Sequence, residues 1–91
     1  MSGTLSVCSI DALILFDTGS TYSFVSSYFA IRFNGHSTLL EYPFSVSTPL
    51  DESVEIRFAY MLCDILIEGR RLLVNLNVME MLDFDVILGM D

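Results

Sequence analysis

The segment between residues 12 and 20 reads Ala12-Leu13-Ile14-Leu15-Phe16-Asp17-Thr18-Gly19-Ser20, so five apolar residues run directly into an aspartate. A short, continuous apolar run of this kind is typical of a strand that is buried on both faces of a sheet. The Asp-Thr-Gly triplet that follows has the composition of a tight loop. The segment therefore predicts a buried strand that delivers one carboxylate, that of Asp17, onto a loop.

A second apolar run, Val86-Ile87-Leu88, ends in Gly89 near the other end of the chain. This run can supply a strand that packs beside the loop at Asp17. Alternating apolar and polar residues predict further strands. The extended segments that we predict are 4–10, 12–16, 22–26, 42–48, 54–61, 63–68, 72–78 and 85–88. Turns are predicted at Asp11, at 49–53 and at 69–70, and a short helix is predicted at 27–33, closed by Asn34-Gly35.

Seven or so short strands with turn signals between them indicate an all-β sandwich or barrel. The chain has 91 residues, the size of one small domain, and no low-complexity tract or linker divides it. We therefore expect a single domain over residues 1–91. The aromatic residues near the predicted helix are expected to belong mostly to the hydrophobic core of the domain. These residues are Phe24, Tyr28, Phe29 and Phe33.

Composition excludes some classes of function. The net charge is −8, from 12 acidic and 4 basic residues, so the chain lacks the basic patch that a nucleic-acid-binding module requires. Its longest wholly apolar stretch is far shorter than the ~20 residues that cross a bilayer. Because 53% of the residues are apolar, we expect part of the apolar surface to form an interface with another chain.

The cysteines and the start of the chain bear on its location in the cell. Cys8 and Cys63 both lie within apolar alternation, and two cysteines do not make a disulfide framework. They are expected to be buried, reduced thiols that act as small hydrophobic residues. The first residues show no secretory signal. These features favour a cytoplasmic location.

An aspartate at the end of a buried strand suits one kind of hydrolysis. Two carboxylates that share one proton can activate a water molecule, because like charges about 3 Å apart cannot both ionise. Gly19 is expected to let the backbone turn sharply beside the carboxylate of Asp17. The hydroxyl of Thr18 is expected to anchor the loop, and that of Ser20 to donate to the outer oxygen of Asp17.

The chain resembles the retropepsin-type aspartic proteases of gypsy-class retrotransposons. The phrases that carry the resemblance are Leu15-Phe16-Asp17-Thr18-Gly19-Ser20, Ser23-Phe24-Val25-Ser26, Ser47-Thr48-Pro49-Leu50 and Asp83-Phe84-Asp85-Val86-Ile87-Leu88-Gly89-Met90-Asp91. The resemblance implies a closed β fold and a homodimer that cleaves a retroelement polyprotein, with one catalytic Asp17 from each protomer. Family members continue past the Ile-Leu-Gly run into a helix, so the C-terminal helix is expected to be truncated here and the dimer to be weak.

The resemblance also assigns roles to residues. Thr18, Gly19 and Ser20 form the active-site loop, and the hairpin at 49–53 corresponds to the flap that closes over substrate. The residues expected to bind substrate are Thr21, Thr48, Pro49, Leu50 and Asp51. The strand that supports the loop contains Ile87, Leu88 and Gly89. No metal or other cofactor is implied.

Other kinds of function remain open from the sequence. A catalytically inactive retropepsin-like module for dimerisation or peptide binding is the main alternative, and a ligand-binding β-barrel is a weaker one. A serine hydrolase is disfavoured because the chain has no Gly-x-Ser-x-Gly motif. His36 is expected to be an exposed loop residue, and Asp83 with Asp85 provides too few carboxylates for a calcium site.

Overall fold

The structure of the chain is a computed structural model, which describes residues 2–33, 35–47 and 53–90. Side chains are described from Ser6 onward. The elements are β1 (Ser2–Val7), β2 (Ile10–Asp17), β3 (Ser23–Ser26), α1 (Ser27–Ala30), β4 (Thr38–Ser47), β5 (Ser53–Ile67), β6 (Arg70–Met79) and β7 (Val86–Gly89). The predicted all-β fold with one short helix is confirmed.

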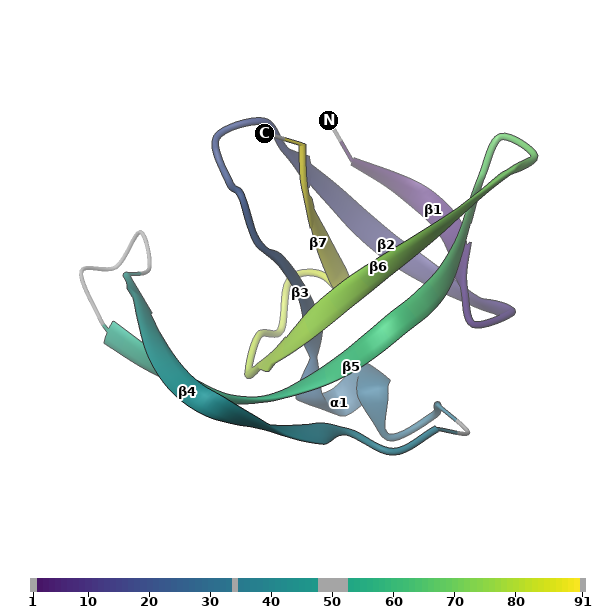
Figure 1. The fold of residues 1–91 in the computed structure, drawn as a ribbon. Helices are drawn as coiled ribbons and strands as arrows, with labels where there is room; N and C mark the ends of the chain where they lie inside the picture. The colour runs from purple at the N-terminus through teal and green to yellow at the C-terminus, as the bar shows by residue number, and fades with distance from the viewer. Residues whose placement is uncertain (1, 34, 48–52, 91) are drawn as a thin grey trace.

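The described strands form one mixed sheet in the order β1-β2-β7-β3-β6-β5-β4 (Figure 1). β1 also pairs with β5, so six of the strands close into a ring, and β4 extends outward from β5. β2 pairs with β7, and β3 with β6, in parallel, while the other pairs are antiparallel. Because β7 lies between β2 and β3, the end of β7 near the C-terminus lies beside the start of the loop that connects β2 to β3.

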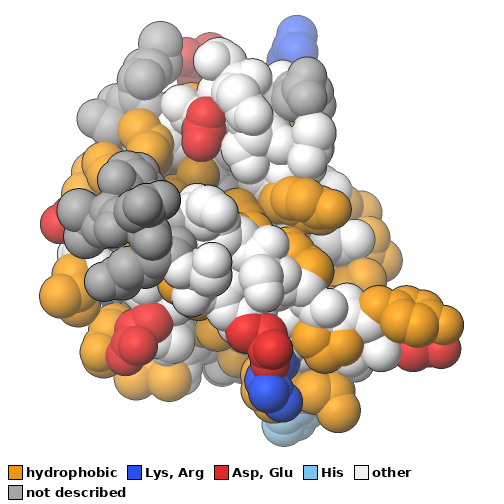
Figure 2. Space-filling view, turned by 90° about the vertical axis from the view of Figure 1, so that its left-hand side faces the viewer, with side chains coloured by type: hydrophobic (Ala, Val, Ile, Leu, Met, Phe, Trp, Pro, Cys, Tyr) orange, Lys and Arg blue, Asp and Glu red, His pale blue; other side chains and the backbone are white. Residues whose placement is uncertain are grey.

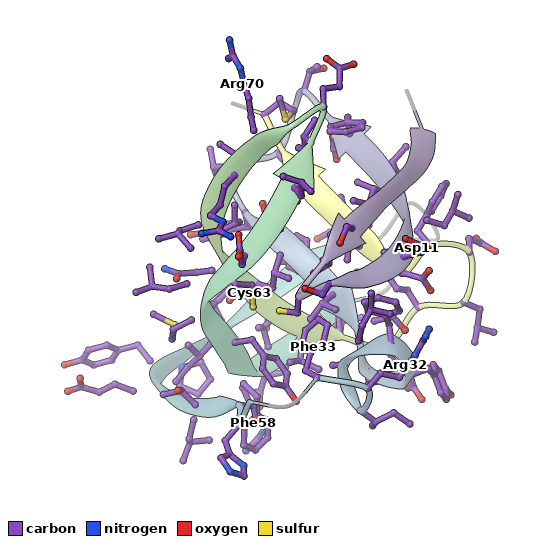
Figure 3. All side chains as sticks on the ribbon, turned by 90° about the vertical axis from the view of Figure 1, so that its right-hand side faces the viewer. Asp11, Arg32, Phe33, Phe58, Cys63 and Arg70 are labelled. Atoms are coloured by element: carbon purple, nitrogen blue, oxygen red, sulfur yellow. The ribbon has the colours of Figure 1, made fainter. Side chains whose placement is uncertain are left out.

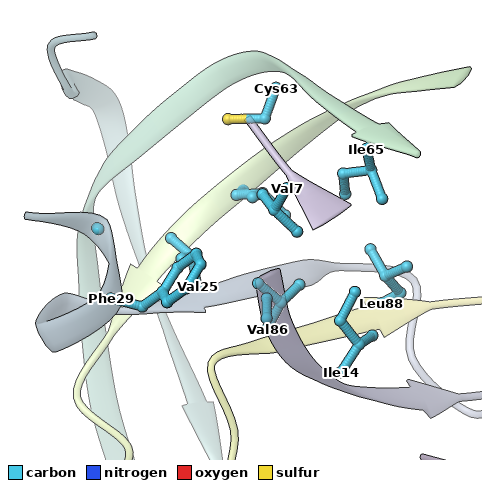
Figure 4. Close-up of a cluster of buried hydrophobic side chains, with 11 residues drawn as sticks. Val7, Ile14, Val25, Phe29, Cys63, Ile65, Val86 and Leu88 are labelled. Carbon is cyan, nitrogen blue, oxygen red and sulfur yellow. The ribbon is translucent and has the colours of Figure 1, made fainter. Parts of the chain in front are cut away.

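The core fills the inside of this ring. It includes Val7, Ile14, Val25, Ile65 and Val86, which come from five different strands and are fully buried (Figure 4). Because side chains alternate across a strand, every second residue faces the core in β2, where Ala12 and Ile14 are buried, and in β7, where Val86 and Leu88 are buried.

The prediction that 12–16 is buried on both faces is wrong. Ala12 and Ile14 are buried, but Leu13 between them is 41% exposed. The apolar run therefore has one face in the core and one face at the surface of the closed sheet.

The first turn lies earlier than predicted. Cys8 and Ser9 connect β1 to β2, with φ values of 50° and 66°, whereas Asp11 lies within β2 opposite Ser6. Two successive left-handed residues suit a two-residue hairpin, which ordinarily uses Asn or Gly. Neither residue is present here, so composition gave no signal for this turn.

The two strands predicted at 54–61 and 63–68 are one strand, β5. A bulge interrupts its pairing with β6 between Tyr60 and Cys63, and Leu62 has a φ of 52°. The Leu62 N–H donates to Oδ1 of Asn75 on β6, so the bulge is held by a side chain. The following turn is at Glu68–Gly69, one residue before the predicted position.

Helix α1 is shorter than predicted. The hydroxyl of Ser26 caps it by accepting from the Tyr28 N–H at 3.2 Å, and the helix ends at Ala30 rather than at residue 33. Phe24 and Phe29 are buried, as predicted, and Phe33 packs edge-on against both Phe29 and Tyr60. Tyr28 differs, because it is 55% exposed.

The surface retains many apolar side chains. Fourteen large hydrophobic residues are exposed among those described. Figure 2 views the molecule from the side of β4, where apolar side chains lie among acidic and polar ones. On β4 itself, Tyr42 is 81% exposed and Leu39 is 66% exposed. No helix in the described ranges is long and apolar enough to span a membrane.

Candidate active site

Asp17 is the last residue of β2, and the parallel pairing of β2 with β7 places it beside Gly89. Its carbonyl oxygen accepts from the Met90 N–H at 2.9 Å and from the Ser20 N–H at 3.4 Å. The backbone of Asp17 is therefore fixed both by the following loop and by the end of β7. This is the juxtaposition that the two apolar runs predict.

The side chain of Asp17 is exposed, and one of its oxygens is held in place. Oδ1 accepts from the Gly19 N–H at 3.0 Å, a contact that sets the direction of the carboxyl group. The carboxyl group lies at a cavity of about 280 Å³.

The walls of this cavity are mostly apolar. Asp17, Ser20 and Ser47 supply its polar atoms. The apolar lining residues come from five strands, and they are Leu15, Phe24, Val46, Met79 and Ile87. An exposed carboxylate therefore faces an apolar pocket that could hold the side chain of a bound peptide.

The support strand β7 divides its residues between the site and the core. Ile87 lines the cavity at Asp17, whereas Leu88 is buried in the core cluster. Gly89 lies against the loop after Asp17, where a Cβ atom would come within 2.5 Å of the Tyr22 carbonyl oxygen and 2.6 Å of the Ser20 carbonyl oxygen. Glycine is needed at position 89 because the loop backbone occupies the space of a side chain.

Gly19 does not have the predicted conformational role in this structure. Its φ is outside the left-handed region, and a Cβ atom would lie 3.6 Å from Oδ1 of Asp17, an ordinary contact. Within one chain, the close backbone approach is at Gly89 rather than at Gly19.

The predicted hydrogen bond from Ser20 to Asp17 is also wrong for this structure. The Ser20 hydroxyl donates to the Tyr22 carbonyl oxygen at 2.7 Å and accepts from the Tyr22 N–H at 3.2 Å. The Ser20 hydroxyl has one proton, and that proton is donated within the loop. Ser20 therefore closes the loop and does not donate to Asp17. For Thr18, no side-chain hydrogen bond is found to any described residue.

Two buried polar residues support the loop and were not predicted. The hydroxyl of Ser23 accepts from the Gly89 N–H at 3.0 Å, and Nδ2 of Asn77 donates to the Ser23 carbonyl oxygen at 3.1 Å. Both residues are 9% exposed. The sequence offered one signal for these roles, the polar residue Asn77 at an inward position of β6. Hydrophobic periodicity alone does not show whether such a polar residue faces the core or the solvent.

Asp85 has a structural position rather than a place in a cation site. Its Oδ2 accepts from the Leu13 N–H at 2.8 Å, its own N–H donates to the Leu13 carbonyl, and its carbonyl accepts from the Ser26 N–H. It thus joins β2 to β3 at the start of β7. Across the described ranges, no group of three or more His, Cys, Asp or Glu residues is arranged to hold a metal ion.

The predicted substrate-binding residues fall in two places. Thr21 lines a separate cavity of about 480 Å³, together with Tyr22, Asn77 and Gly89. The remaining four, Thr48, Pro49, Leu50 and Asp51, lie outside the described residues. The strands on either side of them, β4 and β5, pair from Ser47 opposite Ser53, which confirms the predicted hairpin. His36 is exposed and outside the strands, as predicted.

A family model described as retroviral aspartyl protease matches residues 1–91. The chain belongs to the retroviral aspartyl protease family. The resemblance read from the sequence is confirmed, and the all-β fold agrees with it. A comparison with curated proteins gave no match.

Proposed function

We propose that this chain is an aspartic endopeptidase that acts as a homodimer, with Asp17 of each protomer contributing to one active site. The observation that carries the proposal is the exposed carboxyl group of Asp17 at an apolar cavity, on a loop seated against Gly89. Membership of the retroviral aspartyl protease family supports aspartic protease chemistry at this position.

The chemistry needs two carboxyl groups that share a proton. One ionised carboxylate takes a proton from a water molecule as that water attacks the peptide carbonyl carbon, while the other carboxyl group supplies a proton to the carbonyl oxygen. The proton that was taken from the water molecule is then passed to the nitrogen of the leaving amine. The Gly19 N–H helps by fixing the direction of the Asp17 carboxyl group before substrate arrives.

One chain supplies only one Asp-Thr-Gly triplet, so a second copy must supply the other carboxylate. A twofold axis near Asp17 would bring the two groups together. The exposure of Asp17 leaves it accessible to a partner, and the exposed apolar side chains provide surface that an interface can bury.

The substrate class follows from the walls of the cavity. An extended polypeptide, such as a retroelement polyprotein, would place an apolar side chain against Leu15, Phe24 and Ile87 while its backbone passes Asp17. The β4–β5 hairpin would cover it as the flap.

The direct test replaces Asp17 with Asn in the 91-residue chain and measures cleavage of a peptide library. We expect a loss of at least ~100-fold, because a carboxamide cannot carry the shared proton. Asp11→Asn is the matched control, since Asp11 is an exposed aspartate on the same strand and should retain full activity (Figure 3). Cleavage by the Asp17→Asn chain within about tenfold of the parent would overturn the assignment.

The alternative, a module that binds peptide without cleaving it, gives a different result. The unmodified chain would then bind library peptides, and neither the parent nor Asp17→Asn would cleave them.

A further inference from the structure

The two cysteines of the chain meet where the ring of strands closes. β1 and β5 are joined by two residue pairs, Ser6 with Leu66 and Val7 with Ile65. Beyond them, the Cys8 N–H donates to the Asp64 carbonyl oxygen at 2.8 Å. Cys8 therefore lies opposite the residue next to Cys63.

The side chains of the two cysteines face one another. Cys8 has a φ of 50°, an uncommon conformation for a residue with a side chain, and its side chain packs against the core. Cys63 is 6% exposed and lies next to Val7 in the buried cluster (Figure 4). The Cys63 thiol donates to the Tyr60 carbonyl oxygen at 3.6 Å, and the Cys8 thiol is near enough to contribute to raising the pKa of Cys63. Both are free thiols in this structure.

The two thiols differ in reactivity. Burial, together with the neighbouring Cys8, raises the pKa of the Cys63 thiol to about 12, so Cys63 stays protonated at neutral pH. Cys8 is only partly buried, and both cysteines line a cavity of about 230 Å³. His36, Tyr60 and Asp64 also line this cavity. A small reagent that enters it reacts first with Cys8, because Cys8 is the more exposed of the two thiols and the Cys63 thiol stays protonated.

We propose that Cys8 and Cys63 are a redox-sensitive modification site. A small-molecule disulfide reagent, such as oxidised glutathione, would join their two thiols in a reversible disulfide bond across the β1–β5 seam, the short stretch over which β1 pairs with β5. The Cys8 thiolate attacks one sulfur of the reagent, which forms a mixed disulfide and releases one reduced thiol. Cys63 then gives up its proton and attacks the Cys8 sulfur, which releases the second reduced thiol. Two protein thiols are oxidised and one reagent disulfide is reduced.

The position of the bond gives it a structural consequence. It would connect strands that are paired over only two residues, and it would close a long loop between positions 8 and 63. A cross-link of this kind stabilises the fold, chiefly by constraining the unfolded chain. The site is independent of Asp17, so its test does not depend on the proposed protease activity.

The first experiment treats the folded 91-residue chain with oxidised glutathione and measures free thiols and intact mass. We expect the loss of both thiols, with no retained glutathione and no disulfide between chains. Cys63→Ser should retain one glutathione on Cys8, whereas Cys8→Ser should stay unmodified because Cys63 is buried. Two remaining thiols, a stable mixed disulfide in the parent, or disulfide-linked dimers would each overturn the proposal.

The second experiment compares melting temperatures before and after oxidation. The oxidised parent should melt higher by ~10 °C or more, and a reducing agent should restore the original value. The two serine variants should show no such reversible rise. An unchanged or lower melting temperature in fully oxidised parent would show that the bond does not constrain the seam.

Discussion

At the scale of single residues, Gly89 and Asp17 depend on one another. The Asp17 backbone accepts from the residue after Gly89, and the loop that begins at Asp17 passes over Gly89 with no space for a Cβ atom. The pairing of the two apolar runs was predictable from the sequence. The reason for glycine was not, because it lies in a backbone contact between residues distant in the chain.

Gly89→Ala should therefore displace the loop or destabilise the fold. We expect a loss of about 1–3 kcal/mol in the free energy of unfolding, the usual cost of overpacking, measured by urea denaturation. Gly35→Ala is the control, since a Cβ atom there has no neighbour within 4 Å. Equal stabilities for the two variants would contradict the close approach at Gly89.

At the scale of elements, period-two patterning located most strands but not their ends. It identified both arms of the β4–β5 hairpin, whereas β7 was predicted from the continuous apolar run at 86–88. It failed at Cys8–Ser9, where left-handed residues form a turn without Gly or Asn, and at Leu62, where a bulge lets one strand continue. In both places the tertiary pairing of strands overrides the local preference of the residues.

An aromatic contact connects two elements around the candidate site. Tyr22, in the loop after Asp17, stacks on Phe44 of β4 with ring centroids 4.8 Å apart. β4 leads directly to the segment expected to form the flap. The stack therefore links the position of β4 to the loop that holds Asp17.

A double-mutant cycle tests this link. Tyr22→Ala and Phe44→Ala, made singly and together, should show a coupling of about 0.5–1.5 kcal/mol in unfolding free energy. The cycle of Tyr22→Ala with Tyr42→Ala is the control, because Tyr42 is 81% exposed on the same strand and should be additive. Additivity in the Tyr22–Phe44 cycle would show that the stacked rings contribute no coupling to the free energy of unfolding.

At the scale of the whole molecule, the proposed function needs two carboxylates, whereas the fold of one chain presents one. The ring of strands places one exposed carboxylate at an apolar cavity, and the sequence supplies no second Asp-Thr-Gly triplet. The central claim is that two copies of the chain complete the site with one Asp17 each.

Subunit mixing tests that claim most directly. A fixed amount of the parent chain, at a concentration at which sedimentation shows that it is dimeric, is mixed with increasing Asp17→Asn chain under conditions that allow exchange, and peptide cleavage is measured. If each site needs both carboxylates, an equal amount of Asp17→Asn chain should lower activity to about half, and larger amounts should lower it further. Asp11→Asn chain should not lower it. Unchanged parent activity in the presence of excess Asp17→Asn chain would contradict the account, because it would show that each chain works alone.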